Sequence, residues 1–163
     1  FAQTVWRDEQ YWLKPCLDTL SDWMRKAPDL PQAVIHGDLF RDNAMFDGDT
    51  LTGVIDFYNA ATGWTLLDLA ICVNDWCVDQ QHNQLVINQQ RVDALMNAYN
   101  HARPLNNHEH DAWPMMLQLA ALRFWLSRQQ YAVLHRQQAD VLIKDPDYFR
   151  QLLKLHYQRF MPQ

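Results

Sequence analysis

From Gly63 to the end of the chain, apolar residues recur at spacings of three and four, so most of the chain is expected to be helical. The pattern predicts four helices, over residues 64–78, 84–102, 111–136 and 147–160. Pro114 is expected in the first turn of its helix, where a missing N–H does no harm. Residues 4–26 predict a further amphipathic helix, which Pro15 is expected to kink or divide.

A short segment of β type lies between the first helix and Gly63. Residues 33–36 form an apolar run typical of a buried strand, and residues 37–43 form a polar loop. Residues 44–46 and 51–55 are predicted strands, and the Asp47-Gly48 pair between them favours a tight hairpin turn. We therefore expect an α+β fold, mainly α, with a small β-hairpin.

Composition excludes several classes of protein. The net charge of −5 and the pI near 5.7 argue against a broad surface for nucleic acid or anionic membrane. No apolar run is long enough to span a bilayer. The 3 Cys, odd in number and set in apolar stretches, predict reduced core thiols in a cytoplasmic protein. His108 and His110 are expected on a surface loop, with a metal site as the alternative.

Three residues of the β segment suggest a chemical site: Asp38, Asn43 and Asp56. Antiparallel pairing around Gly48 would bring Asn43 and Asp56 close together. A carboxylate and an amide oxygen suit Mg²⁺, which keeps its other positions for water and phosphate. Asp38 could orient a hydroxyl and accept its proton during phosphoryl transfer. The alternative is that these residues only favour turns.

The pattern H-x-D-L-x-x-x-N, followed 13 residues later by Asp56 in an apolar-Asp-Phe setting, resembles the catalytic and metal loops of protein kinases. The form HGDLxxxN with IDF is similar to the aminoglycoside phosphotransferase and choline kinase branch of that superfamily. More narrowly, HGDLFRDN, GVIDFYNA, LLDLAICVNDWC and ALRFWLSR together resemble bacterial homoserine kinases. The resemblance extends over residues 30–150.

The resemblance implies ATP and Mg²⁺ as cofactors. It makes Asp38 the catalytic base, and Asn43 and Asp56 the magnesium ligands. It places Met45 and Ile55 in the apolar floor beneath the adenine, although both positions also suit ordinary core residues.

The resemblance also assigns two supporting residues. His36 corresponds to the residue that braces the catalytic loop from behind. Asp68 corresponds to a helix carboxylate that holds this loop by its backbone N–H groups, because an acid within an apolar helix needs such partners.

Substrate contacts are expected from later helices. For an amino-acid alcohol, Asp75 would hold the ammonium group and Arg123 the carboxylate through a bidentate fork. The alternatives are an Asp75–Arg123 ion pair or two solvated side chains. Arg41 would either supply charge to the transferring phosphate or face solvent.

The superfamily's ATP-lid lobe, with its Gly-rich loop and strand lysine, is not found in the sequence, because the 4 Gly never approach GxGxxG spacing. Residues 1–163 are thus expected to form one helical C-terminal lobe, with the N-terminal lobe of the same protein as its partner. The implied reaction is phosphorylation of L-homoserine by ATP in a two-lobed parent enzyme, the chain alone having little activity. The alternatives are an aminoglycoside or choline-like substrate, or a non-catalytic kinase-like module.

Overall fold

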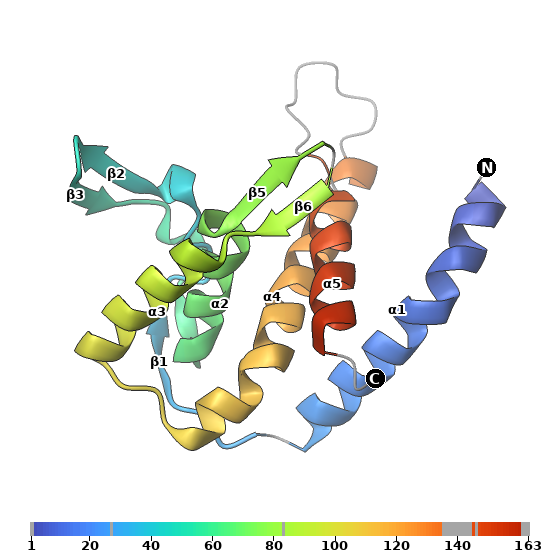
Figure 1. Cartoon of the computed structure of the whole chain (residues 1–163), viewed down its shortest axis with the longest axis horizontal. Helices are drawn as coiled ribbons and strands as arrows, with labels where there is room; N and C mark the ends of the chain where they lie inside the picture. The colour runs from blue at the N-terminus through green and yellow to red at the C-terminus, as the bar shows by residue number, and fades with distance from the viewer. Residues whose placement is uncertain (1, 27, 83, 135–144, 146, 161–163) are drawn as a thin grey trace.

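The computed structural model describes residues 2–26, 28–82, 84–134, 145 and 147–160, and shows a mainly helical fold with small antiparallel β-elements (Figure 1). The helices are α1 (Ala2–Arg25), α2 (Thr65–Trp76), α3 (Gln89–Ala102), α4 (Asn107–Leu134) and α5 (Asp147–Phe160). The strands are β1 (Gln32–Ile35), β2 (Ala44–Asp47), β3 (Thr50–Val54), β4 (Ala61–Trp64), β5 (Val78–Gln81) and β6 (Gln84–Ile87). The mainly helical α+β class predicted from the sequence is confirmed.

The strands form three antiparallel pairs, β1–β4, β2–β3 and β5–β6. The β2–β3 hairpin turns at Gly48, whose φ of 58° is readily adopted by glycine, as the Asp-Gly signal predicted. The β1–β4 ribbon pairs Ile35 with Ala61, and the β2–β3 hairpin lies between these two strands in the sequence. The chain therefore crosses from one ribbon to the other twice, through residues 36–43 and 55–60.

The core forms where α4 packs between α2 and α5 (Figure 1). Its helices meet through fully buried apolar residues: Leu66, Ala70 and Ile71 of α2, Met116, Ala120 and Ala121 of α4, and Leu152 and Leu153 of α5. The small alanine side chains let the backbones of α2 and α4 approach closely. This packing fixes α4 relative to α2, which also contacts the β1–β4 ribbon that precedes it.

A buried polar group joins the same three helices. Asn74 of α2 donates from Nδ2 to the carbonyl of Leu117 in α4 and contacts His156 Nε2 of α5 at 2.7 Å through Oδ1. Tyr148 donates its hydroxyl to the carbonyl of Asn74. Because unpaired polar groups are costly in a core, these bonds favour one arrangement of the helices.

The predicted helix over 84–102 is wrong at its start. Residues 84–87 form β6, which pairs with β5, and α3 begins only at Gln89 with Asn88 as its N-cap, whose side chain accepts from the N–H of Arg91 at 3.2 Å. A strand of only four residues shows too little alternation to be distinguished from the helical spacing that follows it. The helix predicted over 64–78 ends at Trp76, and β4 and β5 were not predicted.

The start of α4 also differs from its prediction. The helix begins at Asn107, so His108 and His110 are helical rather than in a loop, and Pro114 lies inside the helix instead of in its first turn. A reciprocal pair of bonds explains this start: Asn106 Oδ1 accepts from the N–H of Glu109, and Glu109 Oε2 accepts from the N–H of Asn106. Such a capping box stabilises a helix N-terminus.

The three cysteines are buried free thiols, as predicted. Burial raises the pKa of Cys16 to about 11 and that of Cys72 to about 12, which keeps both thiols protonated and weakly reactive. Among the described helices, none has the length and apolar character needed to cross a membrane.

Candidate active site

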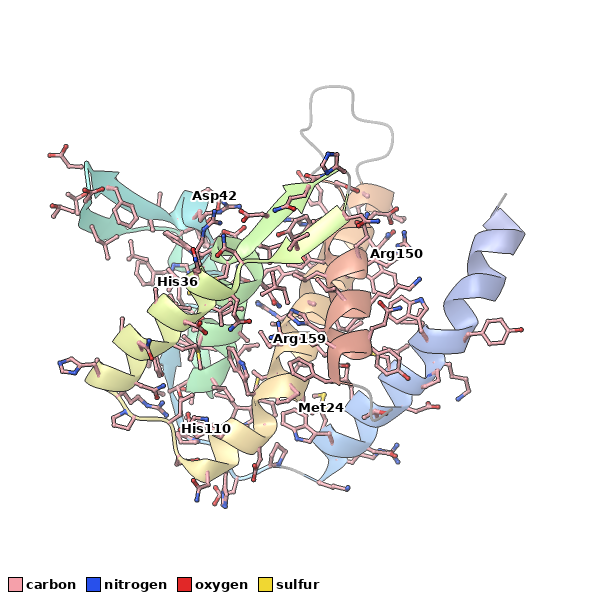
Figure 2. All side chains as sticks on the ribbon, in the orientation of Figure 1. Met24, His36, Asp42, His110, Arg150 and Arg159 are labelled. Atoms are coloured by element: carbon pink, nitrogen blue, oxygen red, sulfur yellow. The ribbon has the colours of Figure 1, made fainter. Side chains whose placement is uncertain are left out.

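The two crossings between the ribbons, residues 36–43 and 55–60, lie side by side because β1–β4 and β2–β3 hold both of their ends. They form one wall of a cavity of about 250 Å³. Asp38, Asn43 and Asp56, which sequence analysis singled out, all line it. In Figure 2, His36 and Asp42 lie near the base of the β2–β3 hairpin, whereas His110 lies at the opposite end of the molecule.

The loop before Asp38 is held by α2. The Asp68 carboxylate accepts from the N–H of His36 at 2.6 Å and from the N–H of Gly37 at 2.7 Å. Gly37 has a φ of 75°, and a Cβ there would lie 2.7 Å from the carbonyl oxygen of Asn59. Glycine therefore meets both a backbone and a space requirement at this point. The Asp68 contacts are those that the resemblance implied.

His36 links the two crossings. Its Nδ1 accepts from the N–H of Asp38 at 3.2 Å, so the ring proton is on Nε2, which donates to the carbonyl of Ile55 at 2.8 Å. The ring also packs on Phe57, with centroids 4.7 Å apart. One neutral imidazole thus fixes the backbone beside Asp38 to the backbone beside Asp56.

Asn43 and Asp56 offer oxygen ligands to the cavity. The buried Asn43 donates from Nδ2 to the carbonyl of Asp38 at 2.8 Å, which commits its amide nitrogen and leaves its amide oxygen available. Asp56 has φ 64° and ψ 61°, a left-handed conformation that an Asp tolerates better than most residues and that often occurs at functional sites.

These two donors fit Mg²⁺. An amide and a carboxylate oxygen are hard ligands, and a two-residue site leaves the remaining positions to water and phosphate. Among the described residues, no cluster of three or more His, Cys, Asp or Glu side chains forms a complete cage for a metal. A metal held here would take its remaining ligands from water or from a bound molecule.

Asp38 lies in a partly desolvated position. Burial raises the pKa of its carboxyl, the nearby Arg123 guanidinium opposes this shift, and the negative charge of Asp56 adds to it. Arg123 donates from Nη1 to the carbonyl of Gly37 and stacks 4.7 Å from the Phe124 ring. Arg123 thus contacts the loop that carries Asp38 as well as lining the cavity.

Four further residues line the cavity, and none of them is assigned a role from the sequence: Asp42, Asn59, Ser127 and Arg128. Ser127 follows Arg123 by four residues, which places these two side chains on one face of α4, whereas Arg128 lies five residues after Arg123 and does not share that spacing. The four-residue spacing from Arg123 is the signal that was available for Ser127. Asp42 and Asn59 carry no separate signal, because polar residues are common in loops.

Arg41 and Asp75 lie outside this cavity. Asp75 Oδ2 accepts from the N–H of Arg41 at 2.7 Å and from its Nε at 3.2 Å. The Asp75–Arg123 ion pair considered from the sequence is therefore wrong, since the partner of Asp75 is Arg41. Both residues border a second cavity of about 200 Å³, which shares Phe40, Asp42 and Arg128 with the first.

Met45 and Ile55 are half-exposed, at 51% and 47%, and neither is a core residue of this chain. Both belong to the region of the β2–β3 hairpin, outside the lining of the cavity. Phe46, Phe57 and Tyr58 are exposed in the same region. The hairpin and residues 55–58, which follow it, therefore present an exposed apolar surface beside Asn43 and Asp56.

The sequence of the chain is similar to those of known proteins. The model of the phosphotransferase enzyme family (APH) matches residues 2–105. Proteins named homoserine kinase are similar to the chain: one from Pseudomonas aeruginosa PAO1 is 45% identical over 150 residues, covering 88% of this chain and 46% of that protein. One from Methylobacillus flagellatus is 51% identical over 127 residues, covering 77% and 38% respectively. One from Nitrobacter hamburgensis is 37% identical over 167 residues, covering 94% and 50%. The chain spans half or less of the length of these relatives.

Proposed function

The chain belongs to the phosphotransferase enzyme family, and we propose that it is the helical C-terminal lobe of an enzyme that uses ATP to phosphorylate the side-chain hydroxyl of L-homoserine. The observation that carries this proposal is the convergence of Asp38, Asn43 and Asp56 on one cavity. The homoserine kinases at 37–51% identity support the choice of substrate.

In this reaction Asp38 orients the substrate hydroxyl and accepts its proton as the oxygen bonds to the γ-phosphorus and ADP leaves. Burial favours the protonated form of Asp38 and so makes its carboxylate a better proton acceptor, while Arg123 keeps the ionised form accessible. Asn43 and Asp56 would hold Mg²⁺, which when bound neutralises charge on the phosphates. His36 and Asp68 keep the loop of Asp38 in place through backbone bonds.

Two features favour an amino-acid alcohol over the alternative substrates. The cavity is lined by both carboxylates (Asp38, Asp42 and Asp56) and guanidinium groups (Arg123 and Arg128), and an amino acid carries a group for each charge, whereas a polycationic aminoglycoside or choline has no anion for the two arginines. A cavity of about 250 Å³ also suits a small molecule. A non-catalytic module would not need all three of Asp38, Asn43 and Asp56 at one site.

We further propose that the exposed apolar surface of the β2–β3 region receives the N-terminal lobe of the full-length protein, with Met45 and Ile55 beneath the adenine of ATP. The chain covers 46% of the Pseudomonas relative, which leaves ample length for such a lobe. The three buried free thiols fit a protein that works in the reducing cytoplasm.

A coupled ADP-release assay of the full-length protein tests the function, with L-homoserine, kanamycin and choline as substrates. Turnover with L-homoserine is expected, and turnover only with kanamycin or choline would contradict it. Asp38→Asn should reduce kcat about 10²–10⁴-fold while the protein stays folded. Asp47→Asn, an exposed Asp at the far end of the hairpin, is the matched control and should keep the wild-type rate.

A further inference from the structure

The α4 wall of the cavity carries two arginines with different surroundings. Arg123 is occupied with the loop, because its Nη1 donates to the carbonyl of Gly37. Arg128 donates from Nη1 to the carbonyl of Asp145 at 3.1 Å, and its remaining donors, Nε and Nη2, have no hydrogen-bond partner among the described residues. In the same part of the chain, no carboxylate forms an ion pair with Arg128.

Aromatic rings fix the orientation of Arg128. Its guanidinium carbon lies 4.4 Å from the centroid of Phe149 and 5.7 Å from that of Tyr148. A guanidinium lying over aromatic rings keeps its N–H groups in a defined plane, and these groups can pair with a carboxylate through two parallel bonds. The residue is thus held rigid before any ligand arrives, which lowers the entropic cost of binding.

The guanidinium of Arg128 is partly desolvated. Burial lowers the pKa of Arg128 from its ordinary value, because the charged guanidinium has lost part of its hydration. The carboxylates of Asp75, Asp145 and Asp42 attract this charge, although none forms an ion pair with it in the described structure. A carboxylate brought by a ligand would therefore meet a preoriented cation.

We propose that Arg128 binds the α-carboxylate of the amino-acid substrate and so determines that the enzyme accepts an amino acid instead of a simple amino alcohol. The inference rests on the proposed function and names the group that selects the substrate. Arg128 and Asp38 line the same cavity, so a substrate anchored at Arg128 can direct its hydroxyl toward Asp38. The carboxylate role expected for Arg123 thereby passes to Arg128, and Arg123 becomes a positioning residue for the loop.

The test compares two substrates in the full-length protein: L-homoserine, and 3-aminopropan-1-ol, which is homoserine without its carboxylate. Arg128→Met should lower kcat/KM for L-homoserine about 10–100-fold, the range for a lost charge-assisted hydrogen bond. For 3-aminopropan-1-ol, the same variant should stay within about threefold of wild type. If 3-aminopropan-1-ol is not turned over, its inhibition constant against L-homoserine is measured instead of kcat/KM. The inhibition constant of 4-hydroxybutanoate, which keeps the carboxylate, then serves as the comparison.

Two further variants separate recognition from structure. Arg123→Met, the matched control on the same helix, should lower kcat/KM for both compounds alike, because it disturbs the loop of Asp38. Arg128→Lys keeps the charge without the planar fork and should recover part of the homoserine activity, which also covers the case in which Arg128→Met fails to fold.

Equal losses for both compounds in Arg128→Met, or a loss confined to L-homoserine in Arg123→Met, would overturn the assignment. A wild-type protein that does not phosphorylate L-homoserine contradicts the proposed function as well. A wild-type protein that does so, with an Arg128→Met variant of unchanged kcat/KM, contradicts this inference alone.

Discussion

The carboxylate of Asp68 accepts a 2.7 Å hydrogen bond from the backbone N–H of Gly37, 31 residues earlier in the chain. Its second oxygen accepts from the N–H of His36. A core helix thus holds the loop that carries Asp38 from behind, through backbone groups, and leaves the Asp38 side chain facing the cavity. The site is built on a rigid element even though its reactive groups lie on loops.

Replacement of Asp68 by Asn should destabilise the protein. The amide of Asn has only one oxygen, so it can accept from only one of the two backbone N–H groups, those of His36 and Gly37, that Asp68 serves. We therefore expect a loss of about 1–3 kcal/mol in the free energy of unfolding. Urea unfolding measures it. Asp18→Asn is the control, since the Lys14–Asp18 pair is exposed and such pairs contribute about 0.5 kcal/mol or less. Equal losses in the two variants would argue against this role of Asp68.

Gly37→Ala should cost more stability than Gly48→Ala. Both positions have positive φ, which costs an L-residue about 1–2 kcal/mol. Only at Gly37 would the added Cβ also lie 2.7 Å from a backbone carbonyl, that of Asn59, whereas nothing lies within 4 Å at Gly48. Urea unfolding of the two variants compares them directly. If Gly48→Ala is the more damaging change, the close approach at Gly37 is not as described.

Asp56→Asn should raise the Mg²⁺ concentration needed for half-maximal activity. Loss of even a group supporting a metal ligand lowers affinity about 10–100-fold, and loss of a ligand charge should do at least as much. Asn tolerates the left-handed backbone of Asp56, so the fold should be kept. Magnesium titration of the rate at saturating homoserine measures the effect.

Asp42→Asn is the control for this titration, because it removes the same charge from the same cavity. It should leave the Mg²⁺ requirement near that of wild type. A shift in Asp42→Asn as large as that in Asp56→Asn would show that the effect is general electrostatics and not metal ligation.

The stability of the protein should depend on pH through His156. Burial, with a smaller contribution from Arg159, lowers the pKa of this histidine to about 3. In the unfolded chain it titrates near 6.5, so between these values the unfolded state binds the proton and the folded state does not. The contribution of neutral His156 is therefore complete above pH 6.5 and is lost as the pH falls toward 3.

His156→Gln isolates this contribution, because Gln does not titrate and its amide can still donate to Asn74 Oδ1. Urea midpoints of wild type and variant are compared from pH 7 to pH 4. The wild type should lose stability more steeply over this range, while the other titrating groups are shared by both proteins. Parallel curves would mean that His156 is not kept neutral by burial.

Much of the site could be predicted from the sequence because its residues are close along the chain. Asp38, Asn43 and Asp56 lie within 19 residues, around a hairpin that the Asp-Gly turn announces. The need of Asp68 for partners follows from its place in an apolar helix, and the structure supplies them. The start of α4 differs from its prediction because Pro114 suggests a first turn, whereas the capping box of Asn106 and Glu109 starts the helix earlier.

The sequence by itself determined the order of the main helices, the hairpin and the chemical groups that the two loops present, because each depends on residues near one another in the chain. Only the tertiary structure decided which distant side chains meet these loops. It paired Asp75 with Arg41, placed Arg123 on the Gly37 carbonyl and set Arg128 over Phe149. Such choices depend on how α2, α4 and α5 pack against one another, and the spacing of residues along a single helix carries no information about that packing.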